Sequence, residues 1–434
     1  MIRLRSLWVV SLFLASHAAR ATDGTGPLDP PGQAGNEGAA SGAPLGRAAF
    51  VREVLRQNPT LESARQGVRA ALARVRAAGV LDDPMVDVGV APLSIGSQAR
   101  VGWEVGVSER LPWFGKRALE TAAESADAEA AKSDYEATER DLALSAVVLY
   151  DQYFVAARSI DINEAHIELL RTLKASAVAG LEAGRASLQD PLAAEVELTH
   201  REHDAIRLAS ERDVVIAQMN ELLHREPDAP LPAPPRELVL PEASPDRGGD
   251  ALSSRPEIAA LRRRARAERA RADRAARDAF PDFTVSTSYS SMWDMPEHRW
   301  TVGLGFNLPV FSGRRAGARD EAFAMQAKYD SDAARAEAAV KTEVFVAKRS
   351  VEQSRHVVRL FEERLLPVAR DQVDAARAGF IASRNPFNVV LEAEQNLRNV
   401  ELEYQMARAE CDRHQGELDR ALGRIPGLEG EARR

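Results

Sequence analysis

One phrase occurs twice in the chain, and its repetition constrains the fold more than any other feature of the sequence. LPWFGKR begins at Leu111 and LPVFSGRR begins at Leu308, so that Pro112 and Pro309 are 197 positions apart. A fixed internal period indicates a repeated structural unit. The same spacing, without a gap, aligns Asn58-Pro59 with Arg255-Pro256, Asp83-Pro84 with Phe280-Pro281 and Trp103 with Trp300. We therefore predict two copies of one unit.

The segments around the two copies give the predicted domain boundaries. A basic start, a short apolar run and small residues indicate a secretory signal rather than a membrane anchor, which is the alternative. The seven prolines between residues 225 and 250 exclude a continuous helix there. The predicted ranges are a signal peptide 1–21, a flexible segment 22–46, a first repeat 47–224, a Pro-rich inter-repeat segment 225–253, a second repeat 254–424 and a C-terminal tail 425–434.

Each copy contains two segments in which apolar and polar residues alternate. The pair of segments spans about 85–111 in the first copy and about 282–308 in the second. In the first, Val86, Val88 and Val90 alternate with polar or small residues. A period of two predicts strands with one apolar and one polar face. Long helical segments flank each strand pair, and no second sheet is predicted that could cover the apolar face. We therefore expect lipid on one face and water on the other, as in an outer-membrane barrel.

Four strands are too few to close such a barrel, because bacterial single-chain barrels begin at about eight strands. No strand edge can remain unpaired in hydrocarbon. Several chains must therefore contribute strands to one barrel. A dimer would supply about eight strands and a trimer about twelve, and the strand count alone does not choose between them.

The helical segments are long and have coiled-coil periodicity. From Gly115 to about Gly180 no residue interrupts the pattern, which predicts a helix about 95 to 100 Å long. In the second copy, apolar positions advance alternately by four and three residues, the spacing of a coiled-coil seam. The seam residues are Val340, Val344, Ala347, Val351, Ser354, Val358, Phe361, Leu365 and Val368. Return helices are expected at about 191–224 and 386–423, and short helices before the strands at about 59–79 and 256–279.

Composition excludes several classes of function. The net charge of -8 argues against a nucleic-acid partner. The single cysteine, Cys411, excludes an internal disulfide, and no cysteine follows the signal to carry a lipid. His200 and His203 lie three apart and could share a metal, but a solvated helix face among charged residues is the preferred interpretation. We find no spacing typical of a catalytic set, and we predict no enzyme activity, no metal site and no cofactor.

The whole pattern resembles the TolC family of outer-membrane efflux proteins. It consists of a signal peptide, a duplicated unit of helices and a strand hairpin, the phrase LPWFGKR at the strand exit, and Gly-containing helical tips. SERLPWFGKR in particular is similar to the branch that serves heavy-metal and related resistance-nodulation-division (RND) pumps. The resemblance, over about residues 47–424, implies a homotrimer, a shared twelve-stranded transmembrane β-barrel and a periplasmic α-helical barrel that meets an adaptor protein. Some members carry a lipidated N-terminal cysteine, which this chain lacks, so we expect the barrel alone to anchor it.

The repeated phrase is interpreted as the joint between the membrane strands and the helices. Pro112 and Pro309 have no amide hydrogen, and we expect each to end the second strand of its pair. Aromatic rings such as those of Trp113 and Phe311 suit the membrane interface. The predicted joint residues are Pro112, Trp113, Gly115, Pro309, Phe311 and Gly313. A phosphate-binding loop is disfavoured, because further glycines and a preceding buried strand are missing.

Two further sites are predicted at the far ends of the helices. The resemblance places adaptor contacts at the helical tips, and the matching segments Ala183 to Pro191 and Ala378 to Pro386 give the candidates. The docking residues are Gly184, Arg185, Ser187, Gly379, Phe380 and Ser383. Asp371 and Asp374, three apart on one helix, are candidates for an acidic pore gate that attracts cations. Ordinary solvated carboxylates are the alternative, and the spacing from Asp374 to Gly379 departs from the family pattern.

The function expected from these features is a passive outer-membrane exit duct of a tripartite efflux system in a Gram-negative bacterium. The partners implied by the resemblance are two further copies of the chain, a periplasmic adaptor protein and an inner-membrane RND-type pump. Metal cations or drugs are the expected substrates, with heavy-metal resistance as the associated phenotype. A duct for a type I secretion or drug efflux system is the alternative. An exported coiled-coil adhesin or structural protein is the rival from another class.

Overall fold

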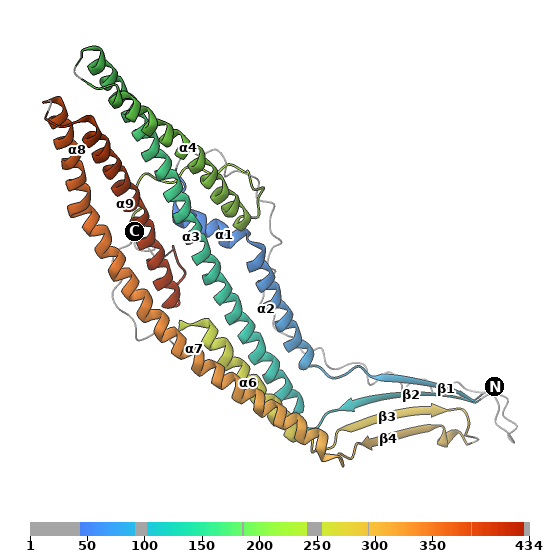
Figure 1. Cartoon of the computed structure of the whole chain (residues 1–434). Helices are drawn as coiled ribbons and strands as arrows, with labels where there is room; N and C mark the ends of the chain where they lie inside the picture. Colours follow the sequence, from blue (N-terminus) through green and yellow to red (C-terminus); the bar gives the residue numbers. More distant parts are fainter. Residues whose placement is uncertain are drawn as a thin grey trace. The chain divides into compact units, whose positions relative to one another are not determined.

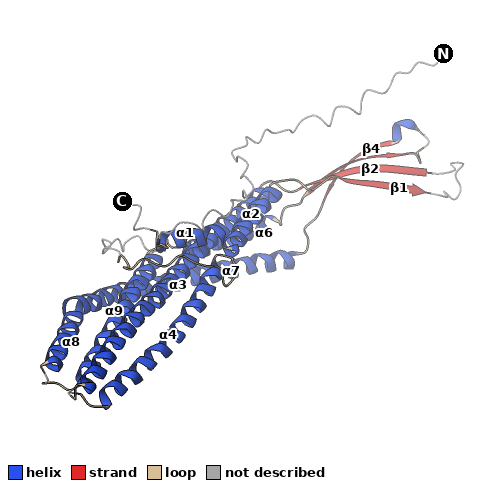
Figure 2. Cartoon of the chain, turned by 90° about the horizontal axis from the view of Figure 1, so that it is seen from above, coloured by secondary structure: helices blue, strands red, loops and turns tan. Residues whose placement is uncertain are grey.

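The computed structural model describes residues 44–91, 102–184, 186–240, 254–293, 295–382 and 384–428, all of which lie in one unit, Pro44–Arg434. Helices dominate it, with one small sheet (Figures 1 and 2). The helices are α1 (Arg47–Gln57), α2 (Pro59–Ala78), α3 (Lys116–Glu182), α4 (Gln189–Leu222), α6 (Pro256–Arg277), α7 (Ser312–Leu360), α8 (Leu366–Ile381) and α9 (Phe387–Ala421). The strands are β1 (Met85–Ala91), β2 (Gly102–Leu111), β3 (Phe283–Ser290) and β4 (Trp300–Phe306), with a short 3-10 turn, η2 (Pro296–His298), between β3 and β4. The mainly helical fold with a small β part is confirmed.

The helices before the two strand pairs begin at the prolines that the repeat aligns. Pro59 and Pro256 each occupy the first position of a helix, where a missing amide hydrogen costs nothing. Asn58 caps α2, because its side chain accepts a hydrogen bond from the amide of Thr60. Each helix then leads into an antiparallel strand pair and a long helix. The predicted boundaries of the repeats and of the terminal segments remain predictions.

The strands form one antiparallel sheet in the order β1-β2-β3-β4. Its register aligns the alternating residues on common faces: Val88 lies opposite Val105, Val105 opposite Tyr289 and Tyr289 opposite Trp300. The opposite face carries Gly, Ser, Thr and charged side chains. Most of the large apolar side chains on the apolar face are exposed in this chain, Val302 by 82%. The sequence therefore predicted the two faces correctly, and nothing in the described chain covers the apolar one.

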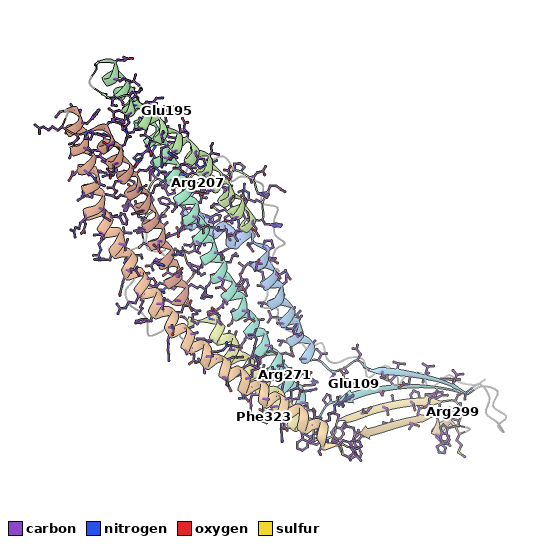
Figure 3. All side chains as sticks on the ribbon, in the orientation of Figure 1. Glu109, Glu195, Arg207, Arg271, Arg299 and Phe323 are labelled. Atoms are coloured by element: carbon purple, nitrogen blue, oxygen red, sulfur yellow. The ribbon has the colours of Figure 1, made fainter. Side chains whose placement is uncertain are left out.

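One charged residue departs from this pattern. Glu109 lies on the apolar face, opposite Val285, close to the end of β2 that leads to α3 (Figure 3). It is the last polar side chain on this face before Leu111, where the strand ends. A carboxylate is better tolerated near a membrane interface than at its centre.

The helices pack around α3 and α7. α3 contacts α2, α4, α6 and α9, and α7 contacts α6 and α9. Ion pairs join α6 to α3, where Arg271 pairs with Asp127 and Glu124 (Figure 3). On the other side of α6, the guanidinium of Arg269 lies 5.4 Å from the ring centre of Phe323 of α7. α6 is therefore held between the two long helices.

The largest apolar core forms where α1 crosses α3. Phe50, Val51 and Val54 of α1 are almost fully buried against Val147 and Phe154 of α3. The described part of the Pro-rich segment, residues 225–240, contains no helix and contributes Leu231, Leu238 and Leu240 to this core. Prolines thus give an extended connection that packs along the helices instead of extending them.

The predicted seam of the second long helix is wrong beyond Phe361. Between α7 and α8 lies one π-helical turn, η3 (Phe361–Leu365), which places one additional residue in the helix. Leu365 and Val368, predicted to be buried, are 39% and 64% exposed, whereas Leu366 and Ala369 are buried. Pro367 explains the turn, because it has no amide hydrogen for an α-helical bond and its ring displaces the preceding carbonyl.

Candidate functional site

The first joint between sheet and helix is closely packed. β2 ends at Leu111, and Pro112 follows it directly, as expected. The ring of Trp113 stacks on Phe280 and Phe283, with ring centres 5.2 and 5.6 Å apart. Gly115 has φ +84°, a left-handed conformation that disfavours other residues, and α3 begins at the next residue. The phrase therefore makes a tight turn from strand to helix.

A buried ionic cluster holds this joint together. The Lys116 ammonium lies 2.8 Å from the Asp282 carboxylate, and both side chains are only 7% exposed. Asp282 also accepts hydrogen bonds from Arg110 at 2.6 Å and from the amide of Trp113 at 2.9 Å. Lys116 donates a further bond to the carbonyl of Phe280 at 3.0 Å. The donors Arg110, Trp113 and Lys116 thus converge on residues just before β3, and Lys116 also pairs with Asp278 at 3.2 Å.

The sequence alone did not identify Asp282 as part of the joint. The signal available was a carboxylate directly before a strand, with Arg110 and Lys116 at the end of another strand. Only the pairing of β2 with β3 brings these residues together, because they are more than 160 positions apart in the chain.

The second joint differs, and one prediction about it is wrong. β4 ends at Phe306, three residues before Pro309, so this proline does not end the strand. Asn307 ends the pairing instead, because its side chain accepts a bond from the amide of Asp282 at 2.6 Å. Phe311 is 85% exposed, and Gly313 lies in the first turn of α7. The second phrase therefore turns more gradually and leaves its aromatic ring unpacked.

The two tip glycines have different structural roles. Gly184, just after α3, has φ +66°, and no described atom lies within 4 Å of the place where its Cβ would be. Gly379 lies inside α8, and a Cβ there would be 2.2 Å from the side-chain amide nitrogen, Nδ2, of Asn385. Gly379 also accepts two backbone hydrogen bonds across the turn, from Arg384 and Asn385. Gly184 thus supplies a left-handed backbone, and Gly379 supplies close approach.

The other predicted tip residues are only partly described. Ser187 accepts a hydrogen bond from the amide of Gln189 at 3.2 Å, at the start of α4. The ring of Phe380 packs edge-on against Phe387, with ring centres 5.5 Å apart. Arg185 and Ser383 lie outside the described residues.

The two tips share one apolar core. Phe387 and Leu391 of α9 pack with Ile167 and Leu170 of α3 and with Leu198 of α4. The segments that lead to Gly184 and Gly379 are therefore held side by side, with their turns at the same end of the helices (Figure 1).

Asp371 and Asp374 are both exposed and lie one turn apart on α8, on either side of the buried Val373. Within the described part of the chain, neither makes an ion pair. The neighbouring Arg370 lies 3.9 Å from Glu401 of α9. The acidic pair is therefore a solvent-facing feature of the isolated chain.

The described residues contain no group of three or more His, Cys, Asp or Glu side chains that could hold a metal ion. His200 and His203 are both exposed on α4. Within the described ranges, no helix has both the length and the apolar character needed to cross a membrane.

Comparisons with known proteins indicate similarity to outer-membrane efflux proteins. Residues 248–424 match the sequence model of the outer membrane efflux protein family. No curated protein sequence matches the chain. The fold is similar to that of CusC, described in a study of folding and transmembrane channel formation, with TM-score 0.75 and 18% identity over 87% of this chain and 92% of that one.

Two further solved structures, both of outer-membrane proteins, resemble the chain with similar TM-scores and identities. VceC of Vibrio cholerae has TM-score 0.73 and 18% identity over 88% of this chain and 97% of that one. The MtrE outer membrane channel of Neisseria gonorrhoeae, in its open state, has TM-score 0.71 and 17% identity over 88% and 89%.

Proposed function

We propose that this chain, a member of the TolC family of outer-membrane efflux proteins, is the passive exit duct of a tripartite efflux system. It lies in the outer membrane of a Gram-negative bacterium, with a large periplasmic part. An inner-membrane pump of the RND type supplies the energy, and a periplasmic adaptor protein joins pump and duct. The chain itself provides a path and performs no chemistry on the substrate.

The observation that carries this proposal is the uncovered apolar face of the sheet. Its outer strands, β1 and β4, each have only one neighbour among the described strands. A sheet in lipid cannot leave edges unpaired, so β4 of one copy must pair with β1 of the next. Three copies give about twelve strands, within the range of outer-membrane barrels, and the family favours this number. The polar face then lines the water-filled interior.

Oligomeric state and conductance test the duct directly. Cross-linking of the detergent-solubilised chain should proceed to three subunits and stop, and planar bilayers should show discrete single-channel currents. Cross-linking that saturates at two subunits, or a native mass of one chain, would contradict the trimer. An exported adhesin would give no channel currents at all.

The substrate is proposed to be a metal cation or a drug. The similarity of LPWFGKR to the heavy-metal branch supports a metal pump, and the match to the wider efflux family supports a drug pump equally. Restoring this chain to a strain that lacks it, and measuring resistance to metal cations and to drugs side by side, separates the two. Export of a protein substrate instead would favour the type I secretion alternative.

The paired tips are proposed as the adaptor-docking surface. Gly184, Arg185, Ser187, Gly379, Phe380 and Ser383 are the candidates. Support comes from the shared core that holds the tips together and from the open space around Gly184, where no described atom is close enough to interfere with an incoming chain. A bulky residue there would prevent close approach of a partner backbone.

Gly184→Trp should abolish export while trimer yield stays unchanged. Gly379→Trp is less clean, since it also displaces Asn385. Gly67→Trp on α2 controls for a new indole ring in open surroundings, and Gly184→Ala controls for strain in the left-handed backbone without added bulk. Normal export by Gly184→Trp would move the docking surface elsewhere, and loss of the trimer would make the glycine a structural residue.

The acidic pair is proposed as a pore gate that favours cations. Three copies of Asp371 and Asp374 around one axis would repel each other and attract cations. The Asp371→Asn, Asp374→Asn double variant should lose cation selectivity, measured as a smaller reversal potential in a salt gradient. Asp330→Asn, an exposed aspartate on α7, is the control. Equal reversal potentials in parent and double variant would show that the pair faces only bulk solvent.

A further inference from the structure

Two buried carboxylates lie near the start of α1, where this helix packs against α3 and its first residue pairs with α9. Asp151 of α3 is 4% exposed and Asp412 of α9 is 1% exposed. Arg47, the first residue of α1, donates a hydrogen bond from Nη1 to Oδ1 of Asp412. Among the described residues, neither oxygen of Asp151 and not Oδ2 of Asp412 has a hydrogen-bond partner. Three carboxylate oxygens are therefore buried without a donor.

The charges in this cluster do not balance if both acids are ionised. Two carboxylates would then face the single guanidinium of Arg47, leaving one uncompensated negative charge in the core. Burying such a charge is costly, and proteins commonly avoid it by protonation. Two carboxylates also cannot hydrogen-bond to each other, because neither has a hydrogen to donate. One proton on the pair neutralises the uncompensated charge and also supplies the hydrogen for a bond between the two carboxyl groups.

Among the described residues around the pair, no other group compensates the second negative charge. From α9, Arg413 also attracts Asp151, but its side chain is 41% exposed and pairs with Glu410 at 3.3 Å. From α3, Tyr150 and Tyr153 are buried phenols, and burial raises the pKa of both, so they stay neutral.

These phenols already have acceptors. The Tyr150 hydroxyl donates to the carbonyl of Leu45 at 2.8 Å, and the Tyr153 hydroxyl donates to the carbonyl of Pro232 at 3.1 Å. Burial, followed by the charge of Asp412 and a hydrogen bond to it, raises the pKa of Asp151 well above its ordinary value, while Arg47 and Arg413 act in the opposite direction.

We infer that Asp151 and Asp412 share one proton, and that this protonated pair fixes α1 to α3 and α9, so that α1 docks less firmly as the periplasm becomes more alkaline. α1 is attached on one side by Phe50, Val51 and Val54 and at its first residue by Arg47. Loss of the proton puts a second negative charge under the helix, and opening of α1 lets water reach it.

The sign of the effect follows from proton linkage. With the pKa of Asp151 raised in the folded state, folded and opened states are both protonated at pH values below the ordinary value of 3.8. As the pH rises above that value, the opened state releases the proton and the docked state keeps it, so docking becomes less favourable. The loss continues until the pH passes the raised pKa, and docking is then constant.

Hydrogen exchange of the detergent-solubilised full chain tests this inference. Exchange of the amides of residues 47–57, corrected for the intrinsic rate, should give an opening constant that rises by up to about tenfold per pH unit, from above the ordinary aspartate pKa of 3.8 until the raised pKa of Asp151 is passed. Asp151→Asn should remove this dependence and keep α1 protected, because its amide donates to Asp412 as the protonated acid does. Asp161→Asn, an exposed aspartate on the same helix, should behave as the parent.

Infrared spectroscopy gives a second readout that does not depend on α1. The parent should show the band of a protonated carboxyl at pH values above the ordinary aspartate pKa of 3.8, and Asp151→Asn should lack it. An opening constant that is flat with pH in the parent, or that keeps the same slope in Asp151→Asn, would overturn the inference. So would a pH effect seen in α3 and α9 but absent from residues 47–57.

Discussion

The two strand-to-helix joints contain nearly the same phrase and are built in different ways. At the first, Trp113 is stacked between two phenylalanines and Lys116 is buried against Asp282. At the second, Phe311 is 85% exposed, and Gly313 occupies the position that the repeat aligns with Lys116. The difference follows from place in the sheet, since β2 is central and β4 is an edge strand.

The comparison separates two kinds of information in the phrase. Its proline, aromatic residue and glycine determine where the chain leaves the sheet. The neighbouring strand determines what the joint packs against: the ring of Phe283 and the carboxylate of Asp282 pack at the first joint, whereas the second joint contacts only the backbone of Asp282. In the proposed ring of copies, the neighbour of the second joint comes from another chain.

The largest expected difference between the joints lies in the ionic cluster. Asp282→Ala leaves the buried Lys116 with only the more exposed Asp278 as an ion-pair partner, 3.2 Å away, which should lower the free energy of unfolding by up to about 3–5 kcal/mol. Asn307→Ala at the second joint removes one hydrogen bond, which its side chain accepts from the amide of Asp282, and should cost about 1 kcal/mol. Denaturant titration of the purified chain, followed by tryptophan fluorescence, measures both.

A double variant shows whether the loss of stability in Asp282→Ala comes from the uncompensated charge of Lys116. Asp282→Ala with Lys116→Met should recover part of the stability lost in the single variant. If the double variant is as unstable as the single one, or if the single variants at the two joints cost the same, the joints do not differ in this way.

The aromatic residues should show a smaller contrast. Trp113→Ala removes two stacking contacts and one edge-on contact of a partly buried ring and should cost about 2 kcal/mol, less than the loss of a fully buried aromatic residue. Phe311→Ala should leave the unfolding free energy of the single chain nearly unchanged, because the ring is mostly in solvent. Equal losses in the same titration would mean that Phe311 is packed in solution.

The glycines give the smallest contrast and one of opposite sign. Gly115→Ala should cost at least about 1 kcal/mol, because residue 115 has a left-handed backbone and its Cβ would displace the Arg277 side chain. Gly313→Ala should stabilise α7 by up to about 0.5–1 kcal/mol, because residue 313 is helical and has open surroundings. Circular dichroism melting curves of the two variants should shift in opposite directions, and a shift of both in one direction would contradict this assignment.

Features with a local period were predictable from the sequence. The strand faces followed from the alternation of residues such as Val86 and Val88, because successive side chains of a strand point to opposite faces. The first long helix followed from an uninterrupted pattern, and α3 runs over Lys116–Glu182 as expected. The short helices followed from Pro59 and Pro256.

Features that depend on long-range pairing were not predictable. The Asp282 cluster joins residues from two repeats, and the buried pair Asp151 and Asp412 joins positions 261 apart. Single charges within helices rich in Arg, Asp and Glu give no local signal for such contacts. The position of the strand end at Phe306 likewise depends on the contact between Asn307 and Asp282.

The π-helical turn at Phe361–Leu365 changes the rotational register of the helix that continues through it. One additional residue turns every later side chain by about 100° relative to those before it. If the same residues formed a regular α-helix, Leu365 and Val368 would lie inside and Asp371 and Asp374 would face a different side, although no side chain would have changed. The direction in which the acidic pair faces is therefore determined by the register of the helix as much as by the carboxylates themselves.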